Sequence, residues 1–362
     1  MKLKRIFSVL AAAAMLCCTT ACGSSGSSSD SSGGTAGNSG NGMPVSPGVL
    51  RGAENLSIGS ASHSPADTEK NYKVGIIKLM DHAALNLSEE GFVAALTDAG
   101  FVIGENLLLE YRNGDGDEAK LNEIADEFIA NNDDLIFAIA TPAAQACAKK
   151  TTKVSIIGTA ITDFVDAGLV QSNARPGTNV SGTTDMSPID EQINLMLDIF
   201  PDIGTIGFVY TASESNSAVQ IATADKYAKS RGLNVVEKTV NSKEDIEGAF
   251  SEIVSQCDAI YLPTDNLIAA NIPIVAGVCN SAKIPVFCAE SGMVEAGGFG
   301  TLGIDYYDLG YQAGLMAVKV LDGTSIDRMS IQKSTKYEYC FNRTAVEALG
   351  ITLPEKYREY II

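Results

Sequence analysis

From residue 72 onward, short apolar runs alternate with segments of helical periodicity, and this alternation constrains the fold more than any other feature of the chain. Between the runs, apolar residues recur at the spacing of one helix face, as they do over 121–129 and 246–254. Strands that are apolar on both faces and alternate with helices are typical of parallel sheets covered on both sides. The sequence therefore predicts an α/β fold, with strands at Lys73–Leu79, Leu107–Tyr111, Leu135–Ala140, Val154–Thr159, Ile206–Tyr210, Val235–Val240, Ala259–Leu262, Pro285–Cys288 and Thr301–Ile304.

A pattern in the first half of this region is repeated in the second half. Asn106–Glu110, an acidic helical segment and Asp134–Thr141 follow one another, and about 125 residues later Asn234–Glu237, another acidic segment and Asp258–Thr264 do the same. Two similar doubly wound lobes explain this repeat better than one large sheet. Because ligands bind beyond the carboxyl ends of the strands in such sheets, we expect the binding site in the cleft between the lobes.

The N-terminus carries the features of a secretory signal peptide over residues 1–21. Three basic residues lie within the first five positions, an apolar run extends from Ile6 to Leu16, and small residues precede Cys22. Residues 19–23 resemble a bacterial lipobox, in which the Cys receives the lipid, although Thr19 stands where Leu is usual. Cys17 and Cys18 fit less well because bulky side chains precede them. An ordinary cleaved signal peptide that contains Cys is the alternative.

The residues after this signal have the composition of a flexible tether, which we place at 22–71. Of the 42 residues from 23 to 64, 23 are Gly or Ser. The remaining residues include too few apolar side chains to form a core. Such a segment spans roughly 35 Å root-mean-square. Five cysteines follow Cys22 without any C-x-x-C spacing, which argues against a disulfide framework or a zinc site. We expect them to be small buried hydrophobic residues.

Charge and motif content exclude several classes of protein. The formal charge of −18 disfavours a partner with a phosphate backbone, and no apolar run after residue 22 is long enough to cross a bilayer. Gly298–Gly303 matches G-x-G-x-x-G by letter, but it precedes a strand rather than following one, so we do not expect a nucleotide. The chain has two histidines, of which His63 lies in the tether. We therefore predict no enzymatic activity, no cofactor and no metal.

Polar residues cluster where the predicted strands end, and we take them as candidate ligand-binding residues. Each of them also suits a helix cap, which is the alternative for any single residue. Together they would surround a cleft with hydroxyls, helix N-termini and carboxylates, the mixture that a zwitterion needs. Thr141, the helix start at 142–144 and Ser215–Ser217 are predicted to bind a carboxylate, and Asp265 or Asp305 an ammonium group. The full set is Asp81, His82, Thr141, Pro142, Ala143, Ala144, Thr162, Asp163, Ser215, Asn216, Ser217, Asp265, Asn266, Glu290 and Asp305.

Several of these segments resemble one family. Residues 74–85, 134–145, 159–163, 213–217, 263–266 and 303–310 are similar to the tryptophan/tyrosine-type substrate-binding lipoproteins of ABC transporters, in order and over about residues 72–353. The resemblance implies a type I periplasmic-binding fold of two lobes joined by a three-segment hinge. It also implies delivery of a small ligand, often an aromatic or branched amino acid, to a membrane permease. The first loop reads Asp81-His-Ala-Ala-Leu-Asn86 where the family commonly has Glu-His-Pro-Ala-Leu-Asp, which affects the contacts of that loop.

The sequence thus leads to one hypothesis and its alternatives. We expect an extracytoplasmic receptor for an ABC importer, attached to the cell membrane through lipid on Cys22 alone and binding an amino acid, with an aromatic one such as tryptophan favoured. Lobe 1 would comprise 72–184 and 290–329, and lobe 2 would comprise 185–289 and 330–362. The same fold binding a sugar, nucleoside or signalling molecule is the first alternative. A sensory module or an extracytoplasmic enzyme is a more distant one.

Overall fold

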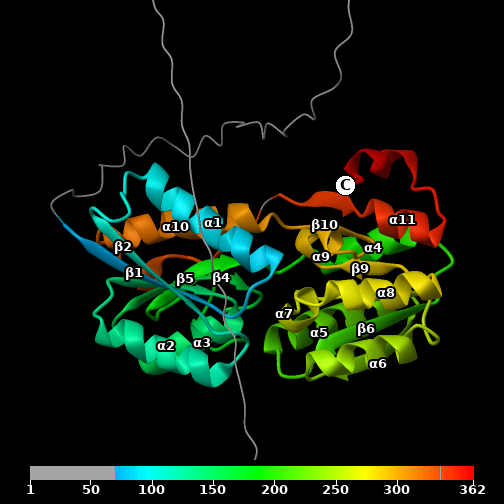
Figure 1. Cartoon of the computed structure of the whole chain (residues 1–362), viewed down its shortest axis with the longest axis horizontal. Helices are drawn as coiled ribbons and strands as arrows, with labels where there is room; N and C mark the ends of the chain where they lie inside the picture. Colours follow the sequence, from blue (N-terminus) through cyan, green and yellow to red (C-terminus); the bar gives the residue numbers. More distant parts are fainter. Residues whose placement is uncertain (1–69, 335) are drawn as a thin grey trace, which may run out of the picture. The chain divides into compact units, whose positions relative to one another are not determined.

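The computed structural model describes residues 70–334 and 336–362, and its strands form two six-stranded sheets (Figure 1). The first sheet has the order β11-β5-β4-β3-β1-β2 and the second the order β12-β10-β9-β8-β6-β7. All pairings are parallel except that of β10 with β12. In the first sheet the strands are β1 (Tyr72–Lys78), β2 (Leu107–Asn113), β3 (Leu135–Ile139), β4 (Ser155–Ile161), β5 (Val180–Thr184) and β11 (Gln332–Lys333). In the second they are β6 (Thr205–Thr211), β7 (Asn234–Val240), β8 (Ala259–Leu262), β9 (Val286–Cys288), β10 (Gly300–Gly303) and β12 (Glu338–Phe341).

Helices cover both faces of each sheet. In the first lobe α2 and α3 lie on one face, with α1 and α10 on the other (Figure 1). In the second lobe α4 and α5 pack together on one face, and α6 packs with α8 on the other. The helices are α1 (Ala83–Asp98), α2 (Glu118–Ala130), α3 (Thr141–Lys150), α4 (Ile189–Ile199), α5 (Ser215–Ser230), α6 (Lys243–Ile253), α7 (Asn266–Ala269), α8 (Ile272–Ala282), α9 (Ser291–Glu295), α10 (Tyr306–Leu321) and α11 (Arg343–Leu349), with 3₁₀ turns at Ile326–Arg328 and Glu355–Tyr360.

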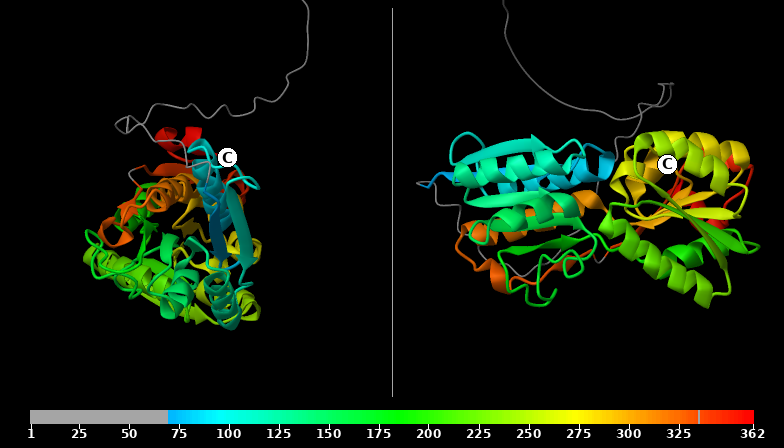
Figure 2. Two further views of the ribbon diagram at one scale, coloured as in Figure 1. Left: turned by 90° about the vertical axis from the view of Figure 1, so that its left-hand side faces the viewer. Right: turned by 90° about the horizontal axis from the view of Figure 1, so that it is seen from below.

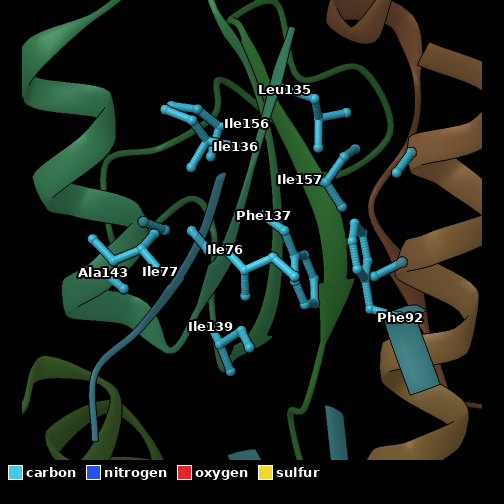
Figure 3. Packing of buried hydrophobic residues seen from close by; sticks show 14 of the residues in the cluster. Ile76, Ile77, Phe92, Leu135, Ile136, Phe137, Ile139, Ala143, Ile156 and Ile157 are labelled. Carbon is cyan, nitrogen blue, oxygen red and sulfur yellow. The ribbon is translucent and has the colours of Figure 1, made fainter. Parts of the chain in front are cut away.

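Each sheet is buried between its helices, which explains the continuous apolar runs. Every residue of β3 is buried, and so is every residue of β8. In the first lobe Phe92 of α1 stacks on Phe137 of β3 with ring centroids 3.7 Å apart, among the isoleucines of β1 and β4 (Figure 3). The two faces of the second sheet each have their own hydrophobic cluster. The α/β architecture predicted from alternation is confirmed.

The chain passes between the lobes three times, and the passages correct the expected lobe boundaries. The first follows β5, the second lies between β10 and α10, and the third lies between β11 and β12. The expected first lobe began its second segment at residue 290, but β10 pairs with β9 and β12 in the second sheet. Likewise β11, expected in the second lobe, pairs with β5 in the first. Composition did not reveal this because short strands of either lobe look alike.

Other expectations fare differently. All nine expected strands are present within one or two residues of their predicted ends, whereas β5, with the sequence Val-Ser-Gly-Thr-Thr, was missed because it is polar. The signal peptide, Cys22 and the tether up to residue 69 lie outside the described residues and stay predictions. Within the described ranges, no helix has the length and apolar character needed to cross a bilayer. The expected cysteine chemistry is confirmed by five buried free thiols, Cys147, Cys257, Cys279, Cys288 and Cys340.

Helix α10 returns to the first lobe because glycines let it lie against α1. Figure 2 shows this orange helix beside the cyan α1, although more than 200 residues separate them in the chain. A Cβ atom on Gly310 would be 2.0 Å from the carbonyl oxygen of Ser88, and one on Gly314 would be 2.8 Å from that of Phe92. Only glycine permits backbones to approach this closely. The contact fixes where α10, and therefore Tyr306 at its start, meets the first sheet.

We expect Gly310→Ala to lower the free energy of unfolding by about 1–3 kcal/mol, the usual cost of overpacking a tight contact. The matched control is Gly248→Ala in α6, where the added Cβ meets nothing within 4 Å and alanine favours the helix by up to about 1 kcal/mol. Urea unfolding of both variants measures the difference. Equal stability of the two variants would contradict the close helix contact.

Candidate functional site

The carboxyl ends of the strands of both lobes meet around a narrow inner cavity whose free volume, about 10 Å³, is roughly that needed by one water molecule. Residues from the first lobe and its connections, and residues from the second lobe, line it together. The sequence-predicted His82, Asp265, Asn266 and Glu290 are among them. The remaining lining residues are Ala84, Leu85, Ala160, Asp185, Thr264, Ala269 and Tyr306.

Two carboxylates in this cavity have partners that carry no positive charge. Asp185, in the passage after β5, accepts hydrogen bonds from the Tyr306 hydroxyl at 2.5 Å and from the Thr162 hydroxyl at 3.1 Å. Glu290 precedes α9 and accepts from the backbone N–H groups of Gly292 at 2.5 Å and Met293 at 2.8 Å. Burial raises the pKa of Asp185 and raises that of Glu290 to about 7.

Asp265 lines the cavity, but its oxygens are engaged by the second lobe itself. They accept hydrogen bonds from the backbone N–H and hydroxyl of Thr211, the hydroxyl of Ser217 and the backbone N–H of Ile268, at 2.6–2.9 Å. These four donors match the acceptor capacity of a carboxylate. Asp265 therefore joins β6, α5 and α7, which is a structural role.

Asp305 also has a structural position. Its side chain accepts from the backbone N–H groups of Tyr307 and Asp308, so it caps the N-terminus of α10. It does not line the inner cavity. Each candidate residue had a helix cap as its alternative role, and Asp305, Asp265 and Glu290 all cap helices in the structure.

A chain of side chains links the first helix of the first lobe to a buried carboxylate of the second. The Nε2 atom of His82 lies 3.2 Å from Oδ1 of Asn266, and Nδ2 of Asn266 donates to Glu214 at 2.6 Å. Glu214 also accepts from the backbone N–H groups of Asn266 and Leu267 and from Asn216. Burial raises the pKa of Glu214 to about 7 and lowers that of His82 to about 4.

A second link between the lobes is made of hydroxyls. The hydroxyl oxygen of Thr162, which follows β4, lies 3.3 Å from that of Thr264, which follows β8. Gln220 of α5 donates to both hydroxyls through Nε2. All three side chains are buried, and each also has a partner besides this link: Thr162 donates to Asp185, and Gln220 and Thr264 bond to each other.

Buried polar atoms without partners lie at the starts of two helices that face the cleft. The structure gives no hydrogen-bond partner to the hydroxyl of Thr141 in α3 or to Oδ1 of Asn216 in α5. Ala140, just before α3, has a φ of 84°, and Ala160 in β4 has a φ of 53°. Non-glycine residues rarely adopt such angles, and they concentrate at functional sites. Both strained residues stand where strands of the first sheet end.

The remaining candidates lie outside the inner cavity. Asp81 is exposed and pairs with Lys78, with 2.8 Å between Oδ1 and Nζ. Asp163 caps the turn that follows β4. Ser215 is exposed at the start of α5. Pro142 faces a wider outer pocket that both lobes also line, next to apolar Met80, Leu121 and Leu267, whereas Ala143 and Ala144 are buried in the first-lobe core.

Sequence reasoning missed five residues of this site: Asp185, Glu214, Gln220, Thr264 and Tyr306. Asp185 was missed because β5 is polar and gave no strand end to inspect. Glu214 lies within the family-like segment 213–217, but it was not among the predicted binding residues, although it precedes a helix start. Gln220 lies one turn after Asn216, and that spacing on one helix face was the signal available for it.

We expect His82→Gln to change how stability depends on pH. Because the imidazole has its pKa lowered from 6.5 to about 4 in the folded protein, its contribution to stability is present above pH 6.5 and is lost as pH falls toward 4. Glutamine keeps an N–H donor for Asn266 but does not titrate. The stability advantage of the wild type over the variant should therefore shrink by about 2 kcal/mol between pH 8 and pH 5. Denaturant unfolding across this range measures it, and a constant gap would show that the imidazole is not buried.

Comparison with known proteins places this geometry in a family. The profile described as ABC transporter substrate binding protein matches residues 73–360. A tyrosine-binding protein of Clostridioides difficile is 39% identical over 292 residues, which cover 81% of this chain and 85% of that protein. A Streptococcus pneumoniae ABC domain crystallised with L-Trp is 33% identical, covers 81% of this chain and 100% of its own, and superposes with a TM-score of 0.78.

A third relative superposes less well on this structure than the Streptococcus protein does, although its sequence is more similar. The ligand-free, open structure of a Clostridium difficile substrate-binding protein with adhesive properties is 41% identical and covers 80% of this chain and 98% of its own, yet its TM-score is 0.65. In the present structure the lobes are joined by His82–Asn266 and Thr162–Thr264. The family match over residues 73–360 shows that the chain belongs to the ABC transporter substrate-binding proteins. Its two parallel-sheet lobes and the three passages between them are those of the type I periplasmic-binding fold.

Proposed function

We propose that this protein is the extracytoplasmic receptor of an ABC importer and that it binds an aromatic amino acid between its lobes. The observation that carries the proposal is the inner cavity, where buried carboxylates from both lobes meet without any Lys or Arg among the lining residues. A zwitterion supplies the missing positive charge. The relatives named for tyrosine and crystallised with L-Trp support an aromatic side chain.

The carboxylate of the ligand would bind at the helix starts, as the sequence predicted. The N-terminal end of a helix carries partial positive charge and free N–H groups, which favour anions. At α3, the buried hydroxyl of Thr141 adds a donor that has no partner in the protein. At the start of α5 only backbone N–H groups would serve the carboxylate, because Asn216 Nδ2 donates to Glu214 and the Thr264 carbonyl and the Ser217 hydroxyl donates to Asp265. The ring would extend toward the outer pocket beside Met80 and Leu267.

Titration with tryptophan tests this proposal directly, since the chain contains no Trp and the ligand would be the only indole present. We expect a saturable blue shift of the indole emission at one site per chain, because the ring leaves water. Tyrosine should compete, whereas sugars and nucleosides should not. If a folded protein neither shifts the emission nor binds tyrosine in a thermal-shift assay, the aromatic amino acid is the wrong ligand.

The same proposal includes a lipid anchor on Cys22, with the permease as the partner at the membrane. The anchor rests on the lipobox-like residues 19–23 and on the Gly- and Ser-rich segment that follows. A tether of this length keeps the receptor within reach of the membrane surface.

Replacing Cys22 by Ser should release the protein from the membrane of a bacterial host, because the thioether to the lipid can no longer form. Cys17→Ser and Cys18→Ser are the matched controls and should leave the protein in the membrane fraction. Fractionation with immunoblotting measures the distribution. If the Cys22 variant stays in the membrane fraction and one control variant is released, the cysteine replaced in that control carries the lipid.

A further inference from the structure

Two buried carboxyl groups of the inner cavity have no cationic partner among the described residues. Asp185 and Glu290 each have 3% of their surface exposed and both line the cavity. Their hydrogen bonds come from hydroxyl groups and backbone N–H groups, which are neutral. Removing a carboxylate from water without a cation costs several kcal/mol. The raised pKa of both groups has this cause.

The two other carboxylates near the cavity are less available to a ligand. Asp265 has four donors from Thr211, Ser217 and Ile268, and Glu214 accepts from Asn216, Asn266 and the backbone of Leu267. A cation bound there would have to displace hydrogen bonds that join helix starts to strands. Asp185 and Glu290 accept two hydrogen bonds each, so each keeps free acceptor positions, although Glu290 uses its two bonds to cap α9.

We propose that Asp185 and Glu290 together form the ammonium subsite, in place of the Asp265 or Asp305 that the sequence suggested. The inference rests on the proposed function and names the feature of the ligand that the site selects. An ammonium group has three N–H donors, and two carboxylates with a neighbouring hydroxyl offer three acceptors. Tyr306 is the positioning residue, because its hydroxyl orients Asp185 from the start of α10.

This subsite also explains how the protein would discriminate between ligand classes. A neutral sugar or nucleoside in the cavity would leave both carboxylates buried without a cation. An aromatic carboxylic acid without an amino group would do the same. A ligand with an ammonium group compensates the charge, so the cavity should select amino acids over their deaminated analogues.

Tryptophan and indole-3-propionate test the inference, since they share the ring and the carboxylate and differ in the ammonium group. We expect the purified wild type to prefer tryptophan by at least about thirtyfold, the effect of losing one buried charge partner. Asp185→Asn and Glu290→Gln should each weaken tryptophan binding by a similar factor while leaving indole-3-propionate within about threefold. Tyr306→Phe should lower tryptophan affinity less and in the same direction.

The control and the contrary outcomes separate this inference from the proposed function. Asp166→Asn removes a carboxylate from an exposed position after β4 and should bind both compounds as the wild type does. If the wild type binds tryptophan and both cavity variants bind it equally well, the subsite is wrong and the proposed function stands. If one variant fails to fold, by circular dichroism, the other and Tyr306→Phe decide. If the wild type binds neither tryptophan nor tyrosine, both proposals fail.

Discussion

The arrangement of the cleft depends on carboxylates that are buried where strands end. Asp265 accepts four hydrogen bonds from three different elements of the second lobe, and Glu214 does the same for α5 and α7. Because an unsatisfied buried carboxylate would cost several kcal/mol, each network holds its helix starts in one position. The second-lobe wall of the cavity is therefore rigid, and Asn266 is presented to His82 at a fixed place.

The first-lobe wall has a different physical basis. Its position depends on the close contact of α1 with α10, in which Gly310 lies against the backbone of Ser88. Tyr306 at the start of α10 and His82 just before α1 are both set by this contact, and both face the cavity. Among the described residues that line the cavity, this leaves Asp185 and Glu290 as the carboxylates with fewer donors than Asp265.

The sequence predicted the site by type and missed part of its composition. His82, Asn266, Thr162 and Glu290 do lie where the two lobes meet, because strand ends of parallel sheets converge at one edge. Asp265 was predicted as a binding residue and does line the cavity, yet its oxygens are occupied by donors from residues 211 and 217, far away in the chain. No local pattern shows whether a carboxylate is saturated. Asp185 was missed because the strand before it is polar and buried by helices that only the fold brings near.

The amino-acid sequence by itself determined the α/β class, the two lobes and nine of the strands, since hydrophobic periodicity is a local property of the chain. It also determined the family, through short segments that keep their order over most of the length. Only the tertiary structure decided which lobe β10 and β11 join and how many donors surround each cavity carboxylate. Both depend on partners distant in sequence: a strand joins the sheet that satisfies its backbone hydrogen bonds, and the charge on a buried carboxylate depends on the donors that the fold places around it.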